Sequence, residues 1–142
     1  MILLDTNVVS EPLKASGDVS VLAWIDAQII ETLYLSTISL AELRFGIAVL
    51  PEGKRRDTLH SSLEQRVLPL FAGRILSFDD PASRAYATLR ARARAAGQAI
   101  APADGYMAAI AATHGFAVAT RDTSPFDAAG LAVINPWTWA AH

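Results

Sequence analysis

Two short apolar segments, far apart in the chain, each lead into an acidic residue. Met1–Leu4 is followed directly by Asp5, and Phe116–Ala119 is followed three residues later by Asp122. Short apolar runs of this kind are typical of strands buried in a parallel sheet. The carboxyl ends of such strands meet at the edge of the sheet where ligands bind. We therefore expect Asp5 and Asp122 to be neighbours, at a site where two carboxylates attract a cation.

The rest of the chain alternates strand-like and helix-like segments, which indicates βαβ units and an α/β fold. Further strands are predicted at 33–36, 74–78 and 131–134. A helix is predicted to start near Ser10, and others at 19–30, 38–50, around 59–67, and at 80–97, 102–114 and 124–129. We expect a single domain spanning residues 1–142, which is long enough to bury a core without metals or disulfides to hold it together.

Composition excludes several classes of site and of protein. The chain has no cysteine, so it has no thiolate metal site, disulfide or cysteine nucleophile. We find no signal peptide and no apolar stretch of about 18 residues, and we expect a soluble, cytoplasmic protein with no membrane association. The formal net charge is −2. Binding to nucleic acid would therefore need a local basic surface.

Four acids stand out by position: Asp5 and Asp122 follow strands, and Glu42 and Asp104 lie in the first turns of helices. Three of them have a purely structural alternative. Ser39 and Glu42 have the spacing of a capping box, Asp104 suits the helix dipole, and Asp122 can open a turn. One shared site explains all four acids at once, whereas the structural alternatives must hold independently.

The chemistry of such a site follows from the repulsion between its members. Carboxylates within about 4–6 Å of one another raise each other's pKa and destabilise the fold unless a multivalent cation offsets their charge. Oxygen ligands without thiolate suit Mg²⁺ or Mn²⁺ rather than Zn²⁺. Such an ion can lower the pKa of a bound water and neutralise charge on a phosphodiester. The four acids therefore predict metal-dependent chemistry on phosphate esters.

The motifs around these acids resemble those of PIN-domain toxins of the VapC and FitB type, with FitB the nearer of the two. The resemblance rests on Leu3–Asn7, Ser39–Gly46, Ala103–Ala109 and Thr120–Asp122 followed by Phe126, and, for the FitB type, on Val8–Pro12, Leu68–Leu76 and Asn135–Trp137. Pro102, just ahead of the third acid, departs from the family pattern.

This resemblance implies a three-layer α/β/α sandwich with a central parallel sheet. It implies that Asp5, Glu42, Asp104 and Asp122 are both the catalytic residues and the ligands of Mg²⁺ or Mn²⁺, and that the activity is cleavage of RNA. It also implies a homodimer that is kept inactive by a small DNA-binding antitoxin, whose basic side chain reaches into the acidic site.

Residues next to the acids are candidates for supporting roles. Thr6, Asn7 and Thr120 can orient the carboxylates or a water on the metal, or simply form hydrogen bonds that end a strand. Arg44 and Arg121 are candidates for contacting RNA or for balancing the acidic charge. The arginines of segments 84–94 and 54–56 either follow phosphates or form a solvated helix face.

Three other interpretations were considered. A pair of imidazoles could cleave RNA without metal, but His114 ends a predicted helix and His142 is the last residue. A phosphotransfer receiver domain needs a lysine near its last strands, and Lys14 and Lys54 both lie elsewhere. The third is a non-catalytic module whose acidic pocket docks a basic partner, and the sequence leaves that alternative open.

Overall fold

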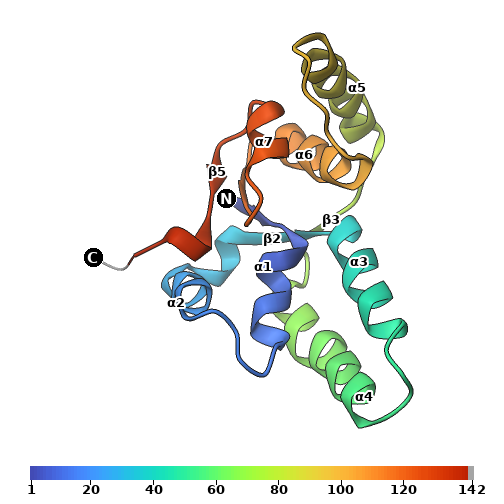
Figure 1. The fold of residues 1–142 in the computed structure, drawn as a ribbon, viewed down its shortest axis with the longest axis vertical. Coiled ribbons are helices and arrows are strands. Elements are labelled where there is room, and N and C mark those ends of the chain that lie inside the picture. The colour runs from blue at the N-terminus through green and yellow to red at the C-terminus, as the bar shows by residue number, and fades with distance from the viewer. Residues whose placement is uncertain (141–142) are drawn as a thin grey trace.

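The computed structural model describes residues 1–140, so His142 lies outside the described part. Within it, a five-stranded sheet is covered by helices on both faces (Figure 1). The strands are β1 (Ile2–Leu4), β2 (Leu33–Ser36), β3 (Ile75–Leu76), β4 (Ala117–Ala119) and β5 (Val133–Ile134). Every pairing is parallel and the order is β3-β2-β1-β4-β5. The predicted three-layer α/β/α sandwich with a parallel sheet is confirmed.

The helices are α1 (Thr6–Ser10), α2 (Val19–Ala27), α3 (Thr37–Ala48), α4 (Lys54–Ser61), α5 (Asp80–Ala95), α6 (Pro102–His114) and α7 (Ser124–Ala128). A π-helical turn, Ser62–Val67, and a 3₁₀ turn, Leu68–Phe71, extend α4 toward β3. Short 3₁₀ turns lie at Glu11–Leu13, Ile30–Thr32 and Pro136–Thr138. No helix within residues 1–140 combines the length and the apolar character that crossing a bilayer requires.

The first helix begins earlier than the sequence predicted. We expected a helix start near Ser10, but α1 starts at Thr6, immediately after β1. Asp5 makes this possible, since its side chain accepts a hydrogen bond from the backbone N–H of Thr6. Helices 102–114 and 124–129 were predicted within one residue of their observed bounds.

Neighbouring residues of the central strands face opposite layers, as the pleat of a strand requires. Leu3 of β1 and Val118 of β4 pack in one core with α5, α6 and α7. Leu4 and Ala119 pack in a second core with α1, α2 and α3. Figure 1 shows these two groups of helices on opposite sides of the sheet. The central strands are thus buried on both faces, which explains why they read as continuous apolar runs.

The strand order places a topological switch point between β1 and β4. From β1 the chain continues to β2 and β3 on one side of the sheet, and β4 and β5 lie on the other side. Register pairs Leu4 with Ala119, and the Asp5 N–H donates to the Ala119 carbonyl at 2.9 Å. Ligands of parallel α/β sheets bind in the crevice beyond such a switch point, where Asp5 leaves β1.

Candidate acidic active site

Asp5 lies at the centre of the candidate site and is held by two donors. Its Oδ1 accepts the Thr6 backbone N–H at 2.7 Å, and its Oδ2 accepts the Thr120 hydroxyl at 2.8 Å. The residue is only 7% exposed. Thr120 directly follows β4, so one hydrogen bond ties the carboxyl ends of the two central strands together. Thr6 and Thr120 therefore both contact the acid, and their role in orienting a metal ligand stays a prediction.

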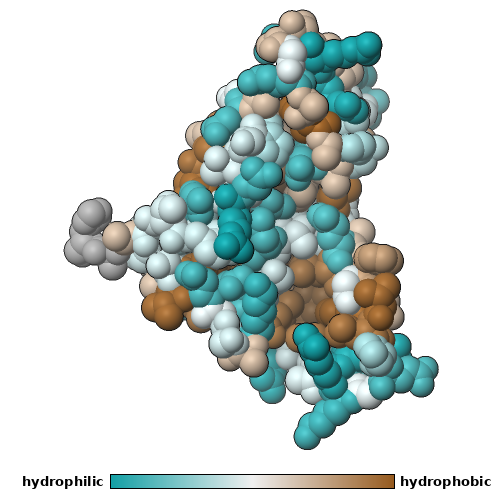
Figure 2. Space-filling view, in the orientation of Figure 1, coloured by the Kyte–Doolittle hydropathy of each residue, from teal (hydrophilic) through white to brown (hydrophobic). Residues whose placement is uncertain are grey.

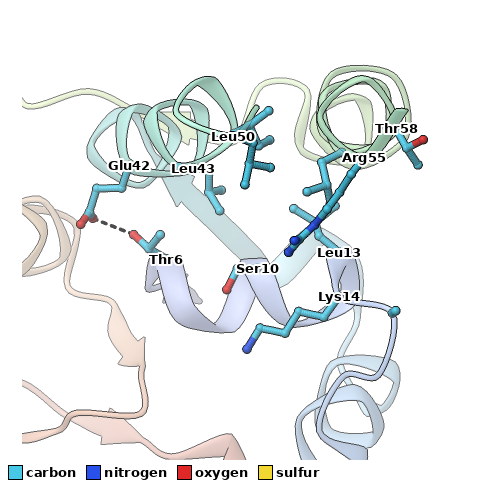
Figure 3. A pocket seen from close by; sticks show the side chains of 13 residues that line it. Thr6, Ser10, Leu13, Lys14, Glu42, Leu43, Leu50, Arg55 and Thr58 are labelled. Carbon is cyan, nitrogen blue, oxygen red and sulfur yellow. Dashed lines mark hydrogen bonds between the residues drawn. The ribbon is translucent and has the colours of Figure 1, made fainter. Parts of the chain in front are cut away.

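Glu42 reaches the site from α3 through Thr6. The Thr6 hydroxyl donates to Glu42 Oε1 at 2.7 Å (Figure 3). The capping-box alternative is wrong, because Ser36 caps α3 by accepting the Ser39 N–H at 3.1 Å. Ser39 lies inside the helix, and its hydroxyl is 3.1 Å from that of Thr6. Glu42 is therefore free to face α1 rather than its own helix end.

Asp104 comes from the first turn of α6, and Asp122 comes from the segment that follows β4. Pro102 is the first residue of α6, a position that proline favours, so the departure from the family pattern leaves Asp104 in the first turn. Within residues 1–140 the Asp104 carboxylate accepts no hydrogen bond, whereas Asp122 Oδ1 accepts the Ser124 N–H at 3.3 Å. Asp122 is exposed and Asp104 is half-buried.

Neighbouring acidic charges act on Asp5 and on Asp104. Burial raises the pKa of Asp5; the hydrogen bonds from Thr120 and Thr6 lower it, and the charges of Glu42 and Asp122 raise it again. Burial also raises the pKa of Asp104, and the charges of the other three acids raise it further. No cation is among the groups that shift either pKa. The charges of this cluster are thus not balanced by basic side chains.

The residues fit a hard divalent cation by their chemistry, although no ligand set is preformed. Within residues 1–140, no three acidic or histidine side chains stand at the separations of a closed metal site. Mg²⁺ commonly keeps several waters and needs only one or two carboxylates. The candidate metal ligands are all oxygen atoms. The buried Oδ1 of Asn7, two residues after Asp5, has no hydrogen-bond partner in the described part of the chain. An uncompensated set of oxygen acceptors suits such an ion.

The two arginines beside the acids in sequence point elsewhere. Arg44 forms a two-point ion pair with Glu64, with Nε–Oε1 2.8 Å and Nη2–Oε2 3.1 Å. The Arg121 guanidinium lies over the Trp137 ring, 5.3 Å from its centroid. Neither is among the groups that shift the pKa of Asp5 or Asp104. In this conformation, neither arginine balances the acidic charge, and a contact with RNA stays a prediction.

An apolar groove, which the sequence did not predict, runs from Glu42 along α1, α3 and α4. Its volume is about 820 Å³, and Figure 2 shows apolar side chains gathered in this hollow. Leu13, Leu43, Ile47, Leu50 and Leu59 are its apolar lining. Thr6 and Glu42 line one end, and Lys14 and Arg55 line the other (Figure 3). The groove is formed by distant segments, so no local sequence signal reveals it.

The sequence profile described as PIN domain matches residues 2–131. The chain belongs to the PIN-domain family. It is 64% identical over 137 residues to the VapC ribonuclease Y4jK of Sinorhizobium fredii, covering 96% of this chain and 98% of that protein. It is 56% identical to the toxin FitB of Neisseria gonorrhoeae, covering 96% of this chain and 99% of that protein.

A solved structure of FitAB bound to an IR36 DNA fragment has the same fold as this PIN domain. The TM-score is 0.95 at 54% identity, and the match covers 100% of this chain and 99% of that chain. This agreement extends over β1 to β5, so the edge that carries the acids belongs to the shared fold.

Proposed function

We propose that this PIN-domain protein is the toxin of a type II toxin–antitoxin system, a ribonuclease that hydrolyses RNA phosphodiester bonds with Mg²⁺ or Mn²⁺. The observation that carries the proposal is the edge of the sheet where Asp5 and Asp104, each with a pKa raised first by burial and then by the charges of neighbouring acids, meet Glu42 and Asp122 without a basic counter-charge. The 64% identity to a VapC ribonuclease supports the choice of RNA as substrate. We place its action in the cytoplasm, where RNA is available.

In this proposal the four acids surround the ion, binding it directly or through its waters, and the threonines orient the acids. When bound, a divalent ion would neutralise charge on the phosphodiester and lower the pKa of a water. Thr120 and Thr6 orient Asp5 and favour its ionised form. Thr6 also fixes Glu42. The Asp104 carboxylate accepts no hydrogen bond within residues 1–140, and the charges of the other acids act on it, so its oxygens are available to the ion.

The partner that we propose is an antitoxin segment seated in the apolar groove. Glu42 gives the groove an acidic end, and Lys14 and Arg55 give it a basic end. An amphipathic segment fits if it buries apolar side chains along α3 and directs a basic side chain toward the acids. The solved FitAB structure includes DNA, which supports an antitoxin that also binds DNA. The homodimer stays a prediction, which light scattering of the purified protein tests.

Cleavage of RNA with and without metal tests the proposed activity. We expect the wild-type protein to cut single-stranded RNA with Mg²⁺ or Mn²⁺ and not in EDTA. Asp5→Asn and Asp104→Asn should each reduce cleavage at least 100-fold, a typical loss for a group used in general acid–base or metal catalysis. Asp26→Asn, which alters an exposed acid of α2, is the matched control and should cleave normally.

The second candidate is a non-catalytic module whose acidic pocket only docks the antitoxin, and the groove favours it as much as the enzyme. No cleavage under any metal condition, combined with intact antitoxin binding, would establish that candidate. Gly46→Phe tests the groove itself, since a Cβ added at Gly46 meets no atom within 4 Å and Gly46 lines the groove. We expect it to weaken antitoxin binding, whereas Val49→Phe, at an exposed position outside the groove lining, should not.

A further inference from the structure

The arginines of α5 are not equivalent in the structure. Arg84 pairs with Asp80 at 2.9 Å, and Arg92 and Arg94 lie exposed in the last turn. Arg90 instead folds back on its own helix. Its Nη1 donates to the Tyr86 hydroxyl at 2.8 Å, and its Cζ lies 5.5 Å from the centre of the Tyr86 ring. Arg90 is therefore held in a defined orientation.

This orientation places Arg90 beside the start of α6, where Asp104 lies. Gly105, which follows Asp104, has no side chain, and a Cβ there would be 2.9 Å from Tyr86 Cε2 and 3.6 Å from Arg90 Cδ. Tyr86 and Arg90 thus pack directly on the first turn of α6. Figure 1 shows α5 beside α6 and extending away from the sheet, so its last turn, with Arg94, lies at the far end of the molecule.

An aromatic cluster fixes this arrangement. The rings of Tyr86 and Tyr106 are 4.9 Å apart, those of Phe78 and Tyr106 are 4.9 Å apart, and those of Phe78 and Tyr86 are 5.9 Å apart. Phe78 follows β3, so the cluster stands at the same edge of the sheet as the acids. Aromatic rings with an adjacent arginine are a recurring means of binding single-stranded nucleic acid.

The charge of Arg90 is also available for a ligand. No acidic side chain within residues 1–140 forms an ion pair with it. It is not among the charges that shift the pKa of Asp104, which are all acidic. The side chain therefore packs on the first turn of α6, while its guanidinium lies outside the electrostatic reach of the Asp104 carboxylate and does not neutralise it. If a single RNA strand lies across the acids, its neighbouring phosphates can bind a cation at the position of Arg90.

We propose that Arg90, positioned by Tyr86 and Gly105, binds a phosphate of the RNA substrate that flanks the bond being cut. The proposal rests on the proposed ribonuclease function and adds a substrate-binding residue to it. Arg90 takes no part in the chemical step, so its contribution should appear in KM and in RNA affinity rather than in kcat.

Steady-state cleavage of a short single-stranded RNA tests this role. Arg90→Ala should raise KM roughly tenfold, as expected for the loss of a charged hydrogen bond, and leave kcat within about twofold. Arg90→Gln keeps a hydrogen-bond donor on a shorter side chain and loses the charge, so it should raise KM similarly. Arg94→Ala is the matched control on the same helix and should leave KM unchanged. Gly105→Ala should displace Tyr86 and Arg90 and raise KM as well.

A binding measurement separates this contact from a structural effect. The measurement uses the Asp104→Asn variant, in which cleavage is strongly reduced. Adding Arg90→Gln to it should make the slope of log affinity against log salt concentration less steep by about 0.7, the value for one phosphate contact on a single strand. If the wild-type protein cleaves RNA and both Arg90 variants match it in KM and in salt slope, the inference is refuted. An equal rise in KM for Arg94→Ala also refutes it. If the wild-type protein cleaves no RNA, the proposed function itself fails.

Discussion

Asp104→Asn should have opposite effects on stability without and with metal. The wild-type carboxylate accepts no hydrogen bond within residues 1–140, and three other acids raise its pKa after burial. Replacing it with a neutral amide removes like-charge repulsion and breaks no such hydrogen bond. We expect the free energy of unfolding of the metal-free protein to rise by about 0.5–1.5 kcal/mol, which is roughly 1–6 °C in Tm for a chain of this length.

With metal the order should reverse. An ion present at about 100 times its Kd stabilises the wild-type protein by about 2.7 kcal/mol, or roughly 5–11 °C in Tm. Asp104→Asn loses a ligand and should show less than half of that shift. The assay is thermal unfolding in EDTA and across a Mn²⁺ titration, with the exposed Asp26→Asn as control. A variant that melts below the wild-type protein in EDTA, or that gains the full shift with Mn²⁺, would contradict the idea of one repulsive, metal-relieved cluster.

Two further predictions concern pairs of hydrogen-bonded groups. The buried carboxylate of Glu11 accepts one hydrogen bond from Lys14 Nζ at 3.0 Å and one from the Asp18 backbone N–H at 2.9 Å. Burial raises the pKa of Glu11, but these hydrogen bonds outweigh it, so the pKa is lowered overall. Glu11→Gln should therefore lower the free energy of unfolding by about 1–3 kcal/mol at pH 7. Measured by urea unfolding, this difference should shrink as the pH falls through the pKa of Glu11 in the folded protein. Thr120→Val removes a hydrogen bond that lowers the pKa of Asp5, so the pKa of Asp5 should rise. The midpoint pH of the Tm increase caused by Mn²⁺ should then also rise, and an unchanged or lower midpoint would contradict this.

Local patterns predicted the parts of the fold that local physics determines. Apolar runs that end in acids identified β1 and β4, because strands buried on both faces carry no polar alternation. The proline at 102 and the glycine at 115 marked α6, since proline suits the first turn and Gly115 has a φ of 69° that favours glycine. The neighbourhood of Asp5 and Asp122 then followed from the geometry of parallel sheets alone.

Local sequence patterns did not predict the contacts between distant segments. Thr6 and Glu42 are 36 residues apart, and nothing local selects that pair. Ser36 and Ser39 both have the chemistry of a helix cap, and only the end of β2 decides between them. The sequence could have predicted that Arg44 points away from the acids. It lies two residues after Glu42 on the same helix, and two residues correspond to a rotation of about 200° around the helix axis. Its partner Glu64 was not predictable, since it lies on another helix.

The hydrogen bond between Thr120 and Asp5 joins residues 115 positions apart. Synthesis of the polypeptide begins with one half of the site and supplies the other half only when about six-sevenths of the 142 residues have been made. A nascent chain on the ribosome therefore carries Asp5 and Glu42 without Asp104 and Asp122, and it has no complete acidic cluster. Under the proposed function, a product that terminates before Asp104 lacks half of the acidic cluster and should not cleave RNA.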